Sequence, residues 1–216
     1  STFAMPLIRR GWKEGSFAYV LKEMCKKLFE ISDYFINNPE GKKSQLRYPR
    51  YLTEKTYAKI VGYMEQTHDL CDQREIIAQL REKYITNIVK TQGQYLGFQS
   101  PRTLLQFIGT EICREISPNY FLDVLRMDME RDQRNTIITD SRFLNERVML
   151  KEEFGAKLVR IKRPQYTPES ITFNDTVENS VLHASETSFG PDESYDIIIL
   201  NNGTITQLQE KITAVL

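Results

Sequence analysis

The chain has 216 residues, 40% of them hydrophobic and 11% aromatic, which is enough for one well-packed domain with an inserted helical lobe. Lysine plus arginine equal aspartate plus glutamate at 29 each, which argues against nucleic acid or an anionic membrane as a partner and requires any anionic ligand to be held locally. No apolar run approaches the roughly 20 residues that cross a bilayer, and three widely spaced cysteines without a CxxC motif predict a reduced, intracellular protein.

The first predicted element is an amphipathic helix over residues 17 to 31, where apolar side chains recur at intervals of three and four. Residues 32 to 51 contain Asn-Asn-Pro, Glu-Gly and Tyr-Pro, so we expect a mobile loop there. This loop is either a solvated connection or a flap that closes over an anionic ligand. Its basic residues are Lys42, Lys43, Arg47 and Arg50.

The segment from residue 53 to 91 is free of proline and predicts two or three helices that form a lobe. Pro101 then marks the start of a further helix, whose apolar side holds Leu104, Ile108 and Ile112. Polar residues recur every four positions along the same helix, which is typical either of a surface helix or of a site for a ligand with a phosphate at one end and a base at the other. These residues are Arg102, Gln106, Thr110 and Arg114.

The last third of the chain predicts short β-strands at 136–140, 157–163 and 195–202, with a helix at 145–154 and another at the C-terminal end. The apolar run at 197–200 is nearly continuous, which is typical of a strand buried on both faces in a parallel sheet. We therefore expect an α/β fold of three layers, in which helices cover a parallel sheet.

Ligands of open parallel sheets bind beyond the carboxyl ends of the strands, so the residues just after each strand are the first candidates. Asp140 is placed to hold magnesium, directly or through water, and Arg142 to neutralise a phosphoryl group. The alternative is that Asp140 caps the next helix and Arg142 forms a surface ion pair. Arg163 ends the next strand and is a second candidate phosphate ligand.

A connection too long for a tight turn comes next, from residue 164 to 194, and connections of this length are often functional. It could serve as a lid, and it contains His183 and Glu186. A lone histidine is more often structural, and His68 has no spacing typical of a metal ligand.

Several motifs in order along the chain together resemble the deoxynucleoside monophosphate kinases of tailed bacteriophages, a P-loop family. They are FAYVLKE, PRTLLQFIGTEICRE, IITDSRFLNE, GAKLVRIKRP, HASE and NNGT, and the similarity covers most of the chain apart from residues 34 to 97. Tyr19 and Val20 depart from the family pattern, which often has Asp and Pro at these positions.

The resemblance implies a phosphate-binding loop of the form GxxxxGK[ST] before the first helix, and this chain contains no such loop. The opening STFA is similar to the residues that come directly after the GK of that loop. We therefore expect the first strand and most of the loop to precede Ser1 in the natural protein, with Ser1 and Thr2 as the surviving hydroxyls that contact the ATP phosphates and, for Ser1, magnesium.

The activity that the resemblance implies is transfer of the γ-phosphoryl group of ATP to a deoxynucleoside monophosphate, with Mg²⁺ as cofactor. Asp140 would organise the magnesium, and Arg142 and Arg163 would stabilise the transferred charge. The implied acceptor-binding residues are Lys22, Arg102, Gln106, Thr110 and Arg114. The implied domains are a nucleotide-kinase core of residues 1–33 and 98–216 and an inserted acceptor-binding lobe of residues 34–97.

Two other interpretations stay open from the sequence, because a fold alone does not fix a function. One is a catalytically inactive relative that binds or sequesters nucleotides, and the other is a structural or host-interaction protein that docks through the helical lobe. For the kinase, we expect small-molecule nucleotides and a second copy of the chain as partners, no nucleic acid or membrane, and a cytoplasmic location, which would be the host cytoplasm for a viral protein.

Overall fold

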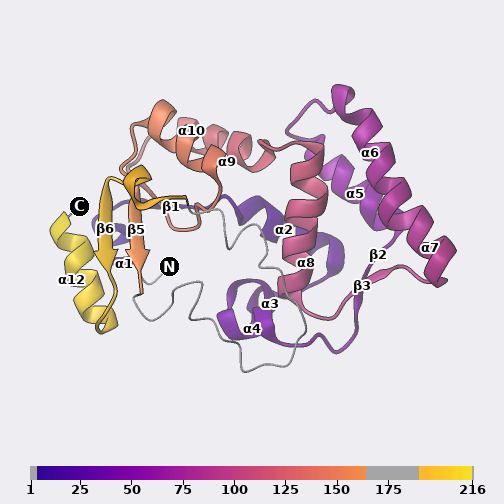
Figure 1. Cartoon of the computed structure of the whole chain (residues 1–216), viewed down its shortest axis with the longest axis horizontal. Helices are drawn as coiled ribbons and strands as arrows, with labels where there is room; N and C mark the ends of the chain where they lie inside the picture. Colours follow the sequence, from indigo (N-terminus) through magenta and orange to yellow (C-terminus); the bar gives the residue numbers. More distant parts are fainter. Residues whose placement is uncertain (1–3, 164–189, 216) are drawn as a thin grey trace. The chain divides into compact units, whose positions relative to one another are not determined.

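The structure is a computed structural model that describes residues 4–163 and 190–215, and the mixture of helices with short parallel strands confirms the predicted α/β class. The chain divides into two compact units (Figure 1). Unit 1 combines residues 1–16 with residues 129–216, and unit 2 is residues 17–128.

Unit 1 contains two pairs of parallel strands. Strand β1 (Lys13–Gly15) pairs with β4 (Thr136–Ile138), with Gly15 opposite Ile138, and β5 (Val159–Lys162) pairs with β6 (Ile197–Leu200). In the part of the chain that the structure describes, each pair is a separate two-stranded sheet. The sequence predicted β4, β5 and β6, but it contained no indication of β1.

The prediction that β6 is buried on both faces is wrong. Ile199 is buried in a cluster with Leu208 and Ile212 of helix α12, whereas Ile198 is 43% exposed and Leu200 49% exposed. The reason is that α12 (Ile205–Val215) covers the face that Ile199 occupies, so alternate residues of the strand are buried (Figure 1). Among the described residues, this unit also contains the helices α1 (Met5–Ile8) and α10 (Leu144–Phe154), and a 3₁₀ turn spans Asp192–Ser194.

Unit 2 is mainly helical, and the periodicity of its sequence predicted most of its long helices. Its core includes side chains with no exposed surface, among them Met24, Ile60, Leu104, Ile108 and Ile112. Its helices are α2 (Tyr19–Phe29), α3 (Asp33–Asn37), α4 (Pro39–Lys43), α5 (Glu54–Met64), α6 (Arg74–Arg81), α7 (Asn87–Gln92), α8 (Pro101–Phe107) and most of α9 (Tyr120–Arg131), whose last residues belong to unit 1. A 3₁₀ turn, Cys71–Gln73, precedes α6, and π-helical segments, Glu82–Thr86 and Ile108–Arg114, follow α6 and α8.

The expected loop over residues 32–51 instead contains two short helices, α3 and α4, and the start of strand β2 (Arg50–Leu52). The Asn38 side chain accepts hydrogen bonds from the backbone N–H groups of Glu40 and Gly41, at 2.8 and 3.2 Å, which caps α4. Pro39 occupies its first turn, where the missing N–H is harmless. Turn-forming residues therefore cap a helix here. Strand β2 pairs antiparallel with β3 (Leu96–Phe98).

The contact-based units group the chain differently from the domains expected from the sequence. Residues 17–33 and 98–128 belong to unit 2, together with the expected lobe of residues 34–97. The functional division into core and acceptor lobe stays a prediction. Among the described residues, no helix has the length and apolar character needed to cross a membrane.

Candidate functional site

The carboxyl ends of β1 and β4 bring together a serine and an aspartate that are 124 positions apart in the chain. Ser16 follows β1, Asp140 lies two residues after β4, and the strands are parallel, so both ends lie at the same edge of the pair. The Ser16 hydroxyl donates a hydrogen bond of 2.6 Å to Oδ2 of Asp140. The structure therefore places Asp140 just beyond the carboxyl end of a parallel strand, as the sequence predicted.

Arg142 lies in the turn between this edge and helix α10, and its backbone is held on both sides. Its N–H donates to Oε2 of Glu146 at 2.6 Å, and the N–H of Phe143 donates to the same oxygen at 3.0 Å. The Arg142 carbonyl accepts a hydrogen bond of 3.0 Å from Nη1 of Arg147. Because Glu146 and Arg147 are only 1% and 4% exposed, this turn rests on buried charged groups and is preorganised.

Arg163 lies at the carboxyl end of β5, in the other strand pair of unit 1, and its side chain is exposed. Two cations that the sequence analysis did not single out precede it on one face of β5. Arg160 donates to Oδ1 of Asp192 at 2.8 Å, and Lys162 donates to Oδ2 at 2.5 Å. The pKa of the Asp192 carboxyl is held below its usual value, mainly by the hydrogen bond from Lys162.

The polar stripe of the sequence analysis lies on one continuous helix of unit 2, which α8 begins and the π-helical segment Ile108–Arg114 continues. Residues spaced four apart make slightly more than one full turn of an α-helix, which has 3.6 residues per turn, so each is rotated a little forward around the helix axis. In a wider π-turn, four residues make slightly less than one full turn, and the rotation is in the opposite direction. The π-turn therefore reduces the spread of the stripe around the helix. Arg102 is exposed, and the other three members are half-buried: Gln106, Thr110 and Arg114.

Arg114 also contributes to the local structure. Its Nη1 donates to the carbonyl of Pro118 at 3.5 Å, and its guanidinium lies 5.1 Å from the centre of the Phe121 ring. Lys22, the remaining acceptor-binding candidate, is half-buried on α2.

The predicted site residues thus fall into separate groups. Asp140, Arg142 and Arg163 belong to unit 1, and the acceptor-binding candidates Lys22, Arg102, Gln106, Thr110 and Arg114 belong to unit 2. Four other candidates lie outside the described residues: Ser1, Thr2, His183 and Glu186. The same holds for most of the expected lid, of which the structure describes residues 190–194.

Two sets of residues in unit 1 were not predicted from the sequence. Ser16 directly precedes the helix predicted over residues 17 to 31 and was not a candidate, because a strand of three residues shows no alternation that would mark its end as a site. The ion pairs of Asp192 with Arg160 and Lys162 cross 30 or more positions, so no local pattern could indicate that Asp192 is the partner. The i, i+2 spacing of the two cations was the available signal, since it places both on one face of a strand.

Metal binding at the β1–β4 edge would depend on oxygen ligands. Within residues 4–163 and 190–215, no group of three or more His, Cys, Asp or Glu side chains is arranged to hold a metal ion. Asp140 and Ser16 offer one carboxylate and one hydroxyl. Such a sparse oxygen set suits Mg²⁺, which commonly takes its other ligands from water and substrate phosphates.

Comparison with known proteins identifies the relatives of this chain. A putative deoxynucleotide monophosphate kinase of Acanthamoeba polyphaga mimivirus is 27% identical over 226 residues, which cover 98% of this chain and 87% of the relative. The deoxynucleoside-5'-monophosphate kinase of Escherichia phage T5 is 26% identical over 144 residues, which cover 63% of this chain and 58% of the relative. The family model for deoxynucleotide monophosphate kinase matches residues 48–212. The chain therefore belongs to the deoxynucleotide monophosphate kinase family.

Proposed function

We propose that this protein is an ATP-dependent deoxynucleoside monophosphate kinase of P-loop type, which transfers the γ-phosphoryl group of ATP to the phosphate of the acceptor. Family membership and two relatives named as kinases support this function. The hydrogen bond between Ser16 and Asp140, at the carboxyl ends of two parallel strands, is the observation that connects this proposed function with particular residues.

In this proposal, unit 1 binds the phosphoryl donor, ATP. Asp140 and Ser16 would hold Mg²⁺, which supplies charge neutralisation to the phosphates when it is bound. Arg142, in its fixed turn, would place a guanidinium against the transferred phosphoryl group, and Arg163 would add a second cation. Ser1 and Thr2 would contact the ATP phosphates as the end of a phosphate-binding loop.

Unit 2 would bind the acceptor, the deoxynucleoside monophosphate. Arg102 and Arg114 lie at opposite ends of the polar stripe, and guanidinium groups bind phosphate through paired hydrogen bonds. Gln106 and Thr110 lie between them, and an amide and a hydroxyl can each donate and accept hydrogen bonds. Lys22 would supply a further positive charge.

The test is to incubate the natural protein, with any residues that precede Ser1, with ATP, Mg²⁺ and each of the four common deoxynucleoside monophosphates. Diphosphate formation with at least one acceptor is expected, and no product with any of them contradicts the proposal. Arg142→Ala should lower turnover by about 100-fold or more, because a positioned charge stabiliser is lost. Arg134→Ala is the matched control, since Arg134 is exposed and pairs with Asp132, and its turnover should stay near that of the wild type.

A further inference from the structure

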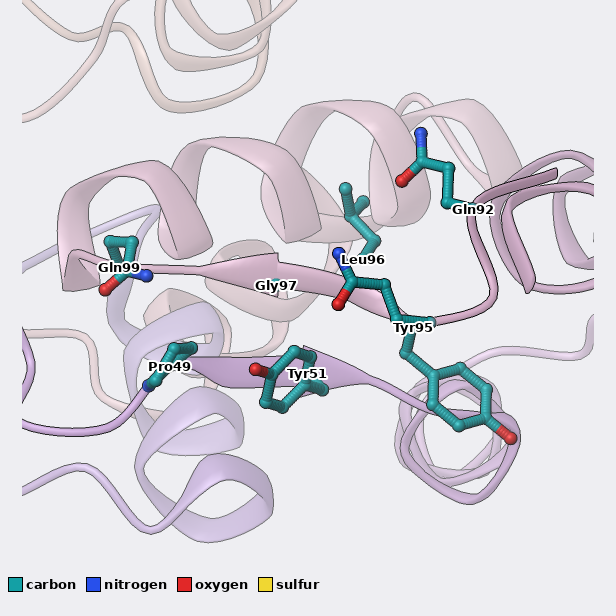
Figure 2. A pocket seen from close by; sticks show the side chains of 8 residues that line it. Pro49, Tyr51, Gln92, Tyr95, Leu96, Gly97 and Gln99 are labelled. Carbon is teal, nitrogen blue, oxygen red and sulfur yellow. The ribbon is translucent and has the colours of Figure 1, made fainter.

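A cavity of about 270 Å³ opens on the outer face of the two-stranded β2–β3 sheet in unit 2 (Figure 2). Small-molecule pockets commonly range from about 300 to 1,000 Å³, so this one suits a single ring system better than a whole nucleotide. Its lining residues are Pro49, Tyr51, Gln92, Gln94, Tyr95, Leu96, Gly97 and Gln99.

The alternation of strand residues explains why Tyr51 and Gly97 share this face. Tyr51 pairs with Gly97 in the antiparallel register, and alternate residues of a strand point to one face. The neighbouring positions Leu52 and Phe98 are buried on the opposite face, where the Phe98 ring lies 5.2 Å from that of Phe107. Leu52 and Phe98 thus anchor the β2–β3 sheet to the core through one face, and the other, outer face is open to a ligand.

Gly97 allows an aromatic side chain to lie flat against the sheet. A Cβ atom at this position would come within 2.9 Å of Cε1 of Tyr51, so a larger residue would displace the ring. Tyr51 is 43% exposed and Tyr95 is 39% exposed, so both rings can be reached from solvent. Exposed aromatic rings of this kind are surfaces on which nucleobases stack.

The polar groups of the cavity are neutral. Gln92, Gln94 and Gln99 are exposed, and the structure records no side-chain hydrogen bond for them within the described residues. An amide carries both donors and acceptors, as the edge of a nucleobase does. No lining residue is charged, so the cavity does not suit a phosphate group.

We propose that this β2–β3 groove binds the nucleobase of the acceptor, by stacking against both Tyr51 and Tyr95 and by hydrogen bonds from the glutamine amides. The assignment to the acceptor rests on the proposed function. Within unit 2, Gln99 is separated from Arg102 by only two residues, so a base in the groove and a phosphate on α8 would be held by adjacent parts of one chain segment.

The test uses nucleosides that lack a phosphate. The full protein is titrated with thymidine and with deoxyguanosine by calorimetry or ligand-observed NMR, and with deoxyribose 5-phosphate as a probe without a base. Tyr95→Ala and Gly97→Ala should each weaken nucleoside binding about tenfold, the loss expected when a base loses its stacking surface. Binding of the sugar phosphate should be unchanged. Tyr48→Ala is the matched control, because Tyr48 is 63% exposed and lies outside the lining.

Absence of nucleoside binding, or equal binding by all variants, overturns the proposal. The acceptor assignment has its own readout, since Tyr95→Ala should raise the KM for the acceptor with little change in kcat. An unchanged KM in an active enzyme shows that the acceptor base binds elsewhere, while the kinase function stands. Nucleoside binding that depends on Tyr95, in a protein that forms no diphosphate, instead refutes the kinase and leaves the groove a nucleobase site.

Discussion

Glu146 and Arg147 show how a buried charge can serve a site without touching a ligand. Each is almost fully buried, and burial of a charge is costly unless hydrogen bonds replace those lost from water. Glu146 accepts from two backbone N–H groups, and Arg147 donates to a backbone carbonyl and lies 5.6 Å from the ring of Tyr195. Both side chains therefore fix the backbone on either side of Arg142.

The three cysteines differ in burial, and their reactivity should differ accordingly. Cys25 and Cys113 are buried without exposed surface, and burial raises the pKa of Cys25 to about 12 and raises that of Cys113 as well. Cys71 is exposed, although its hydrogen bond with Asp69 raises its pKa too. An aromatic disulfide reagent at pH 8 should modify one thiol in the folded protein and all three after unfolding in guanidinium chloride.

The Cys71→Ser variant is the control for this measurement and should show no reactive thiol while folded. Rapid modification of two or three thiols in the native wild type would mean that Cys25 or Cys113 is accessible, and would contradict the packing described for unit 2.

At the scale of elements, Asp196 ties the start of β6 to neighbouring segments. Its Oδ2 accepts a hydrogen bond of 2.8 Å from the N–H of Leu158, and its Oδ1 pairs with Lys151 of α10 at 3.2 Å. These contacts hold the pKa of Asp196 below its usual value, and the hydrogen bond from the Leu158 backbone contributes most. The Asp196 carboxylate therefore binds a proton more readily in the unfolded chain than in the folded one. At a pH above the ordinary aspartate pKa of about 3.9, the ionised carboxylate stabilises the fold. This contribution is lost as the pH falls through the lower pKa of the folded state.

Asp196→Asn should therefore lower the melting temperature at pH 7, and the difference from the wild type should shrink toward pH 3. Thermal unfolding followed by circular dichroism across this range measures both. Asp72→Asn is a suitable control, since Asp72 is exposed and the described residues give it no ion pair. A difference between Asp196→Asn and the wild type that stays constant with pH would show that the charge of Asp196 does not matter.

Two glycines of unit 2 should respond to alanine in opposite directions. A Cβ atom on Gly41 would lie 2.5 Å from the backbone oxygen of Tyr34, where α3 and α4 pack together, and a backbone atom cannot turn aside. Gly41→Ala should destabilise the protein by about 1–3 kcal/mol, the range for overpacking. Gly62 lies inside α5 with nothing within 4 Å, so Gly62→Ala should stabilise it by about 1 kcal/mol through helix propensity.

Urea unfolding of both variants beside the wild type measures the two free-energy changes. A neutral Gly41→Ala would mean that α3 and α4 are not packed as the structure has them. A destabilising Gly62→Ala would mean that this position in α5 is more crowded than the structure has it.

The elements that the sequence predicted well are those in which a pattern repeats several times. Helices α2, α5 and α12 each span 11 residues, which is enough for a periodic apolar face to show. Strands β1, β2 and β3 have three residues each, too few for an alternation to be recognised. The π-turn after α8 leaves no local signal either, because the same residues are compatible with an ordinary α-helix.

At the scale of the whole molecule, the sequence predicted the α/β class and the family but not which residues meet. Asp140 could be named as a candidate because strand ends in parallel sheets follow a general rule. Its hydrogen-bond partner could not, because Ser16 lies 124 positions away and only the pairing of β1 with β4 connects the two. The β2–β3 groove was missed for the same reason, since its two strands are separated by more than 40 positions.

The central claim is that the carboxylate of Asp140 organises phosphoryl transfer, and steady-state turnover of Asp140→Asn tests it most directly. Asp132→Asn is the matched control, because Asp132 forms its contacts with Arg134 and Lys13 in the same unit. We predict that Asp140→Asn lowers kcat by about 100-fold or more, with a melting temperature close to that of the wild type, while Asp132→Asn keeps its activity. Wild-type turnover by Asp140→Asn, or a loss no larger than its loss of folded protein, would contradict this account.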